Sequence, residues 1–246
     1  MSIVTLKKIK DLSLTEQKIA KMIDYGPALA APYTEDEVRL TCAEAIKYNF
    51  KLVVVLEHFI PLVKKLLKGT DIIIGGIFSY PLGNICTESK IVEIKNVINK
   101  GAEAIDGVLP LSALKAGDIG FVKEETEKLV SIAREMKKDI EIKFMVEISY
   151  LNDEEIVTAA KIVKDSGADF IKTGTGWAPW GPSISQIKLI RKTVGPDFGV
   201  KASGAEVEGS INNFLAYYEA GANRFGLGSA VRVMENFKMF QENLIK

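Results

Sequence analysis

Three lysines lie inside apolar stretches in the second half of the chain, at equal intervals of 29 and 29 residues. They are Lys143 in Ile-Lys-Phe-Met-Val, Lys172 in Phe-Ile-Lys-Thr-Gly and Lys201 in Gly-Val-Lys-Ala-Ser. A buried strand has little use for an ammonium group, so the repeat predicts a shared polar pocket with a lysine at the same inward position of each strand. A lysine whose pKa is lowered in such a pocket can attack a carbonyl carbon and form a Schiff base.

Asp106 is a carboxylate that could serve this chemistry, since it alone interrupts the apolar run Ala-Ile-Asp-Gly-Val-Leu-Pro. If Asp106 faces the three lysines, repulsion between ammonium groups and partial desolvation lower at least one lysine pKa, and the carboxylate can pass protons through water. Plainer alternatives stay open: lysines that reach water at strand ends, and a structural ion pair at Asp106. Asp24 is a further site candidate, or simply the start of a turn.

Glycine-bearing turns follow three consecutive strand candidates. They are Gly174-Thr175-Gly176, Ser203-Gly204-Ala205 and Gly226-Leu227-Gly228-Ser229. Bare backbone N–H groups after the last strands of a barrel often bind phosphate, although glycine also marks ordinary turns. Trp177 and Trp180 come next after the first turn and are candidates for walls of the pocket, or for a covered rim or a subunit contact.

Short apolar runs alternate with segments of helical period along the chain. Strands are expected at residues 22–25, 52–56, 71–78, 104–110, 140–148, 169–173, 198–202 and 224–227. Helices are expected from near Ser13 and at 35–48, 121–137, 153–166, 184–192, 211–220 and 231–244, with Thr34 and Asn152 as N-caps. Eight strand–helix units in about 250 residues predict a (β/α)8 TIM barrel of the α/β class, one domain over residues 1–246 with a short N-terminal helix. An open doubly wound sheet is the alternative, but no Gly-x-Gly-x-x-Gly follows the first strand.

The composition excludes several classes of protein. The 32 Lys+Arg residues balance 32 Asp+Glu residues, so no general attraction to nucleic acid or to an anionic membrane is expected. No secretory signal and no run of about 20 apolar residues occurs, which favours the cytoplasm. Cys42 and Cys86 form no metal-binding pair and are expected to be small buried residues. His58 is the single histidine, which excludes a histidine-based triad and a multi-histidine metal site.

Several segments resemble the deoxyribose-phosphate aldolases, in the same order, from about residue 22 to residue 230. The segments are Gly-Ala-Glu-Ala-Ile-Asp (101–106) with Leu-Lys-Ala-Gly (114–117), Glu-Ile-Lys-Phe-Met-Val-Glu (141–147), Gly-Ala-Asp-Phe-Ile-Lys-Thr-Gly-Thr-Gly (167–176), Gly-Val-Lys-Ala-Ser-Gly (199–204) and Ala-Asn-Arg-Phe-Gly (222–226). The resemblance implies a (β/α)8 barrel, class I aldol chemistry that needs neither metal nor cofactor, and a homodimer or higher homo-oligomer.

The resemblance also implies a role for each matching residue. Lys172 would form the Schiff base with acetaldehyde, Lys201 would depress the pKa of Lys172, and Asp106 with a water and Lys143 would move protons. The cleaved substrate would be 2-deoxy-D-ribose 5-phosphate and the acceptor D-glyceraldehyde 3-phosphate. The residues implied to bind this small-molecule substrate are Asp24 at its hydroxyls, Gly176, Gly204, Gly226 and Ser229 at its phosphate, and Thr175 and Gly228 in the same turns.

The chain departs from the family pattern where the acceptor would bind. Gly204 is followed by Ala205, Glu206 and Glu208 where the family has a second glycine and a basic residue. Gly228 occupies the position of a family serine, and the chain has Gly174-Thr175-Gly176 where the family has Ser-Thr-Gly. The first strand ends in Asp24-Tyr25-Gly26, where the family has Asp, then His or Leu, then Thr. Three hypotheses follow. The first is an aldolase for 2-deoxyribose 5-phosphate, and the second is the same Schiff-base chemistry on another aldehyde acceptor, either unphosphorylated or differently substituted. The third is a non-catalytic barrel that binds a sugar phosphate or a protein partner.

Overall fold

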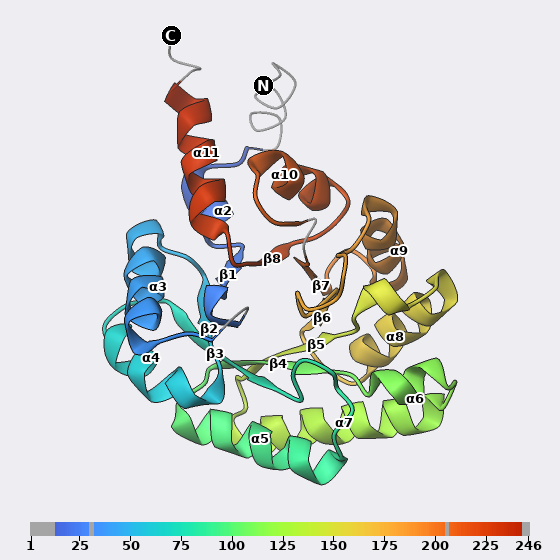
Figure 1. The fold of residues 1–246 in the computed structure, drawn as a ribbon. Helices are drawn as coiled ribbons and strands as arrows, with labels where there is room; N and C mark the ends of the chain where they lie inside the picture. The colour runs from blue at the N-terminus through green and yellow to red at the C-terminus, as the bar shows by residue number, and fades with distance from the viewer. Residues whose placement is uncertain (1–12, 30–31, 205–206, 243–246) are drawn as a thin grey trace.

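The structure is a computed structural model that describes residues 13–29, 32–204 and 207–242. Within these ranges the strands pair in parallel in chain order, and β8 pairs with β1, so the sheet closes into a barrel (Figure 1). The strand bounds are β1 (Ile23–Tyr25), β2 (Leu52–Val54), β3 (Ile73–Phe78), β4 (Ala104–Val108), β5 (Glu141–Met145), β6 (Phe170–Lys172), β7 (Gly199–Ser203) and β8 (Arg224–Leu227). The predicted (β/α)8 TIM barrel is confirmed.

Helices surround the barrel on its outer face (Figure 1). Their bounds are α2 (Glu16–Ala20), α3 (Glu35–Tyr48), α4 (Ile60–Leu66), α5 (Thr87–Lys100), α6 (Leu111–Lys115), α7 (Ile119–Met136), α8 (Asp153–Asp165), α9 (Ile184–Val194), α10 (Ile211–Glu219) and α11 (Ala230–Glu242), with 3-10 turns η1 (Pro27–Leu29), η2 (Glu57–Phe59) and η3 (Ile148–Tyr150). Thr34 and Asn152 accept the predicted capping hydrogen bonds, each in a reciprocal box with the glutamate three residues later. No described helix is both long and apolar enough to cross a membrane.

The apolar residues form two separate layers. In the larger layer, outward-facing strand residues such as Ile105 and Phe225 pack with Val97 of α5 and Phe214 of α10. The smaller layer lies on β2, β3 and β4 and consists of Leu52, Val54, Ile77 and Ala104. Because residues paired across a parallel sheet share a face, and Asp24 pairs with Leu52, this smaller layer faces the barrel interior. The interior is therefore apolar on the β2–β4 side, which leaves its charged residues to the remaining strands.

The structure corrects several expectations from the sequence. β5 ends at Met145 instead of continuing to residue 148, because Glu147 takes a left-handed conformation (φ 45) and η3 begins after it. No helix was predicted at α5. The buried residues of this helix include Lys90, and a lysine on the inner face interrupts the apolar period by which a helix is predicted. Cys42 is buried as expected, but Cys86 is exposed at the N-cap of α5. The predicted end of the last helix at residue 244 lies outside the described residues.

Candidate active site

Charged side chains from six strands meet inside the barrel. They are Asp24 on β1, Asp106 on β4, Glu141 and Lys143 on β5, Lys172 on β6, Lys201 on β7 and Arg224 on β8. Lys201 Nζ lies 2.7 Å from both Asp24 Oδ2 and Asp106 Oδ2. Lys172 Nζ donates a 3.1 Å hydrogen bond to the same Asp106 oxygen. The structure thus brings together the four residues that the sequence singles out for chemistry, and Lys201 lies at their centre.

All three lysines point into the barrel interior, but of the three only Lys172 and Lys201 line the cavity above the cluster. Lys172 pairs directly with Lys201 across β6 and β7. Lys143 Nζ lies 3.4 Å from Asp106 Oδ1 and 3.6 Å from Asp24 Oδ2, and its side chain is fully buried. Lys143 therefore faces the same two carboxylates as Lys201 without reaching the cavity.

Two further members of the charged cluster, Arg224 and Glu141, were not among the predicted site residues. Arg224 Nη1 donates to Asp24 Oδ1 at 2.8 Å, and Nη2 donates to Glu141 Oε2 at 3.0 Å. Glu141 Oε1 lies 2.5 Å from Lys143 Nζ. A sequence signal existed for Glu141, since residues i and i+2 of a strand share a face and Lys143 already pointed inward. Arg224 opens β8 and gives no such signal on its own.

The cluster holds its carboxylates ionised. Burial alone would raise the pKa of Asp106 and of Asp24, but neighbouring cations outweigh it, led in both cases by Lys201 and Lys143, and both pKa values lie well below their usual range. Burial would lower the pKa of Lys143, yet the carboxylates of Asp106, Asp24 and Glu141 raise it above its ordinary value. Lys143 is therefore a permanent cation.

The pKa of Lys172 shifts in the opposite direction from that of Lys143. Burial and then the adjacent Lys201 ammonium lower its pKa from 10.5 to about 8, despite the opposing effect of Asp106. Four basic side chains face three carboxylates in this cluster, so loss of one proton makes the group electrically neutral. Since Lys172 lies at the edge of the cluster and lines the cavity, it is the amine that can release that proton and meet a ligand.

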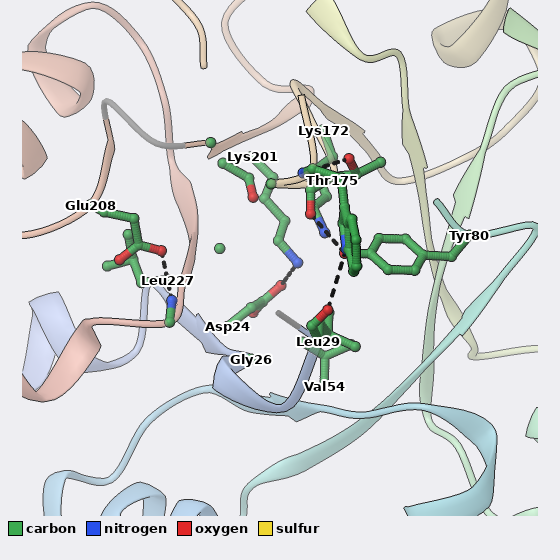
Figure 2. Close-up of a pocket in the computed structure, with 16 residues that line it drawn as sticks. Asp24, Gly26, Leu29, Val54, Tyr80, Lys172, Thr175, Lys201, Glu208 and Leu227 are labelled. Carbon is green, nitrogen blue, oxygen red and sulfur yellow. Dashed lines mark hydrogen bonds and ion pairs between the residues drawn. The ribbon is translucent and has the colours of Figure 1, made fainter. Parts of the chain in front are cut away.

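A cavity of about 390 Å³ opens above the cluster at the carboxyl ends of the strands. It is lined by Asp24, Lys172 and Lys201, by the glycine turns at Gly176, Gly204, Gly226 and Gly228, and by Leu29, Val54, Tyr80, Thr175, Trp177, Ser203, Glu208 and Leu227, among others. Figure 2 shows Tyr80 and Glu208 on opposite sides of this pocket, with Lys201 and Asp24 between them. Gly226 leaves room for the lysine, because a Cβ there would lie 3.0 Å from Lys201 Cε.

The loop between β6 and α9 forms one wall of the cavity. Glu147 accepts hydrogen bonds from the backbone N–H and the hydroxyl of Thr175, and the Tyr80 hydroxyl donates to the Thr175 carbonyl at 2.9 Å. Trp177 lines the cavity and donates from Nε1 to the Leu29 carbonyl at 3.4 Å. Trp180 is exposed and is not among the lining residues. Trp177 therefore forms part of the pocket wall, whereas Trp180 does not.

The last glycine turn is already occupied by a side chain of the protein itself. The Glu208 carboxylate accepts hydrogen bonds from Gly228 N at 2.7 Å, from Ser229 N at 2.8 Å and from the Ser229 hydroxyl. Ser229, expected to touch substrate, is engaged by Glu208 and does not line the cavity, whereas Gly228 does. Ala205 and Glu206, two other departures from the family pattern, lie outside the described residues. No group of three or more His, Cys, Asp or Glu side chains in the described ranges is arranged to hold a metal ion.

Comparison with known proteins places this geometry in a family. The model of the DeoC/LacD family aldolases matches residues 18–209, well over half of the chain. The chain belongs to the DeoC/LacD family of aldolases. A protein of Caldanaerobacter subterraneus subsp. tengcongensis named deoxyribose-phosphate aldolase is 40% identical over 233 residues, which cover 95% of this chain and 97% of that protein. One of the same name from Thermococcus gammatolerans is 39% identical over 219 residues, covering 88% and 95%.

The fold comparison agrees with the family assignment. The tetrameric deoxyribose phosphate aldolase of Aeropyrum pernix matches with a TM-score of 0.84 at 27% identity, over 97% of this chain and 99% of that one. As a DeoC/LacD aldolase, this chain is an enzyme of the lyase class. The family resemblance expected from the lysine segments is thereby confirmed.

Proposed function

We propose that this chain is a class I aldolase that reversibly cleaves a 2-deoxy-D-ribose substrate through a Schiff base on Lys172. The observation that carries the proposal is the position of Lys172: its amine lines the cavity, has a pKa lowered to about 8, and lies 3.1 Å from Asp106. A neutral amine next to an ionised carboxylate supplies both a nucleophile and a proton acceptor.

The proposed reaction starts when the neutral Lys172 amine attacks the C1 aldehyde carbon of the open-chain sugar. Water leaves and one proton is taken up from solvent, giving a protonated imine. The C3 hydroxyl then loses its proton, through a water, to Asp106. The C2–C3 bond breaks and its electron pair flows toward the iminium nitrogen, which yields an enamine and releases the C3–C5 aldehyde. Asp106 then returns its proton through the water to the enamine carbon. Hydrolysis of the resulting iminium frees acetaldehyde, the neutral Lys172 amine and the proton taken up in the first step.

The remaining charged residues act through these two groups. Lys201 lies between Asp24 and Asp106 and disfavours a second positive charge on Lys172. Lys143 binds Asp106 and, after Lys201, lowers its pKa, so that its part in proton transfer passes through Asp106. Asp24 is held by Arg224 and Lys201 at the cavity floor, where it can orient a substrate hydroxyl.

The first candidate substrate is 2-deoxy-D-ribose 5-phosphate, which would give acetaldehyde and D-glyceraldehyde 3-phosphate. The names of the relatives support it. The second candidate is a sugar of the same skeleton without the phosphate, and the occupied turn at Glu208 favours it. We further propose a cytoplasmic homo-oligomer whose subunits each form one domain over residues 1–246. The tetrameric relative supports the assembly, and the free thiols of Cys42 and Cys86 fit a reducing compartment.

The test is release of acetaldehyde from 2-deoxy-D-ribose and from its 5-phosphate, measured by coupled reduction of the aldehyde. The proposal expects release from at least one of the two sugars and its loss, by a factor of about 10⁴ or more, in Lys172→Arg. No release from either sugar, or full activity in Lys172→Arg, would defeat it.

A further inference from the structure

The carboxylate of Glu208 binds donors that are suited to an anion. Gly228 N and Ser229 N immediately precede α11, where unpaired backbone N–H groups and the helix dipole favour negative charge. Glu208 takes one N–H on each of its two carboxylate oxygens and also accepts from the Ser229 hydroxyl. These donors are saturated by a residue of the chain itself.

The surrounding contacts fix Glu208 in this position. Gly209 N donates to Ser229 Oγ at 2.9 Å, which leaves the hydroxyl proton directed at the Glu208 carboxylate. The Asn213 amide donates to the Glu208 carbonyl at 3.1 Å and ties the Glu208 backbone to the first turn of α10. The loop and the side chain are therefore held by hydrogen bonds at several atoms.

The cavity offers no other positive charge at this end. Among its lining residues in the described ranges, the cations are Lys172 and Lys201. Both bind Asp106, and Lys201 binds Asp24 as well. A phosphate that reached Gly228 would have to displace Glu208 or lie against it, and two anions repel strongly in a site partly shielded from water.

We infer that Glu208 is the specificity-determining residue for the distal end of the substrate, and that it selects a sugar with a free hydroxyl over one with a phosphate. A hydroxyl can donate a charge-assisted hydrogen bond to the Glu208 carboxylate, whereas a phosphate oxygen finds its donors taken. The inference rests on the proposed aldolase chemistry and decides between the two candidate substrates in favour of 2-deoxy-D-ribose.

The experiment compares kcat/KM for 2-deoxy-D-ribose and for its 5-phosphate in the full-length enzyme. The wild type should prefer the unphosphorylated sugar by about tenfold or more. Glu208→Ala and the shape-conserving Glu208→Gln should move this ratio toward the phosphate by at least about tenfold. Glu235→Gln, an exposed glutamate on α11, makes the same change in net charge and should leave the ratio unchanged.

Inorganic phosphate gives a second readout that needs no sugar phosphate. At millimolar concentration it should inhibit cleavage of 2-deoxy-D-ribose by Glu208→Ala and leave the wild type unaffected. A wild type that prefers the 5-phosphate, or a ratio unaltered in both Glu208 variants, overturns the inference. Borohydride trapping of acetaldehyde on Lys172 does not involve the distal end. Absent trapping therefore counts against the proposed aldolase chemistry, whereas normal trapping with an unaltered ratio counts against the role of Glu208 alone.

Discussion

Lys172 Nζ and Asp106 Oδ2 are 3.1 Å apart, and the same carboxylate oxygen also binds Lys201 at 2.7 Å. One acceptor shared by two ammonium groups cannot fully compensate both charges in a buried site. The repulsion between the two ammonium groups is relieved if one lysine is neutral, and Lys172 is the lysine whose pKa is lowered. This relationship links the packing of the barrel interior to the nucleophile.

The pH dependence of Schiff-base formation should report the lowered pKa of Lys172. Burial and Lys201 favour the neutral amine, so the trapping rate should rise with pH, reach half its maximum near pH 8, and level off above it. Below pH 8 it should fall about tenfold for each pH unit, since the neutral fraction does so. The check is initial-rate borohydride trapping from pH 6 to pH 10.5; a midpoint near 10.5, the ordinary value for lysine, would contradict the account.

Lys201→Met should move that midpoint upward, above pH 8. The substitution removes the cation that opposes protonation of Lys172 and leaves Asp106 freer to stabilise the ammonium form. Lys90→Met is the matched control, because Lys90 is also a fully buried lysine but pairs with Glu125 far from the cavity lining. It should lower stability and leave the midpoint in place. If Lys201→Met and the wild type have the same midpoint, Lys201 does not lower the pKa of Lys172.

Asp106→Asn should shift the midpoint in the opposite direction while abolishing turnover. Loss of the carboxylate withdraws the charge that raises the Lys172 pKa, so trapping should persist with a midpoint below 8. Cleavage should fall by about 10²–10⁴, the usual contribution of general acid–base catalysis. The measurement is trapping and sugar cleavage on the same preparation; if both fall together with no change of midpoint, Asp106 serves structure alone.

Arg224→Met should destabilise the fold. Arg224 binds the fully buried Asp24 and also Glu141, and removal of one member of a buried ion pair costs about 3–5 kcal/mol where the other charge is left uncompensated. Lys201 and Lys143 still face Asp24 in this variant, so the expected cost is about 2–3 kcal/mol. Arg39→Met, which removes an exposed pair with Glu35, should cost less than about 1 kcal/mol. Urea unfolding measures both variants. A cost no larger than that of Arg39→Met would show that Lys201 and Lys143 are sufficient to hold Asp24 in the absence of Arg224.

The sequence predicts the barrel and the core of the site because both depend on local patterns. Strand-to-helix alternation fixes the fold, and charged residues inside apolar runs point inward wherever the strand is covered on both faces. For this reason Asp106, Lys172 and Lys201 could be predicted. The absence of Lys143 from the cavity lining could not be predicted, since it depends on how side chains from several strands pack together.

Other features depend on contacts between distant parts of the chain. Arg224 meets Asp24 across 200 residues, and no local pattern pairs them. The sequence showed that Glu208 lies where the family has a basic residue, and it suggested a different aldehyde acceptor as the consequence. The structure adds that Glu208 binds the donors themselves, which follows from how the loop after β7 meets the start of α11.

The central claim is that Lys172 is the nucleophile. It is tested most directly by incubating the enzyme with acetaldehyde and borohydride, digesting it, and locating the adduct by mass spectrometry. We predict an ethyl adduct on the Lys172 side chain, stoichiometric with active enzyme and absent from Lys172→Arg. An adduct confined to Lys201, to Lys143 or to surface lysines, or no adduct in an enzyme that still cleaves the sugar, would contradict the account.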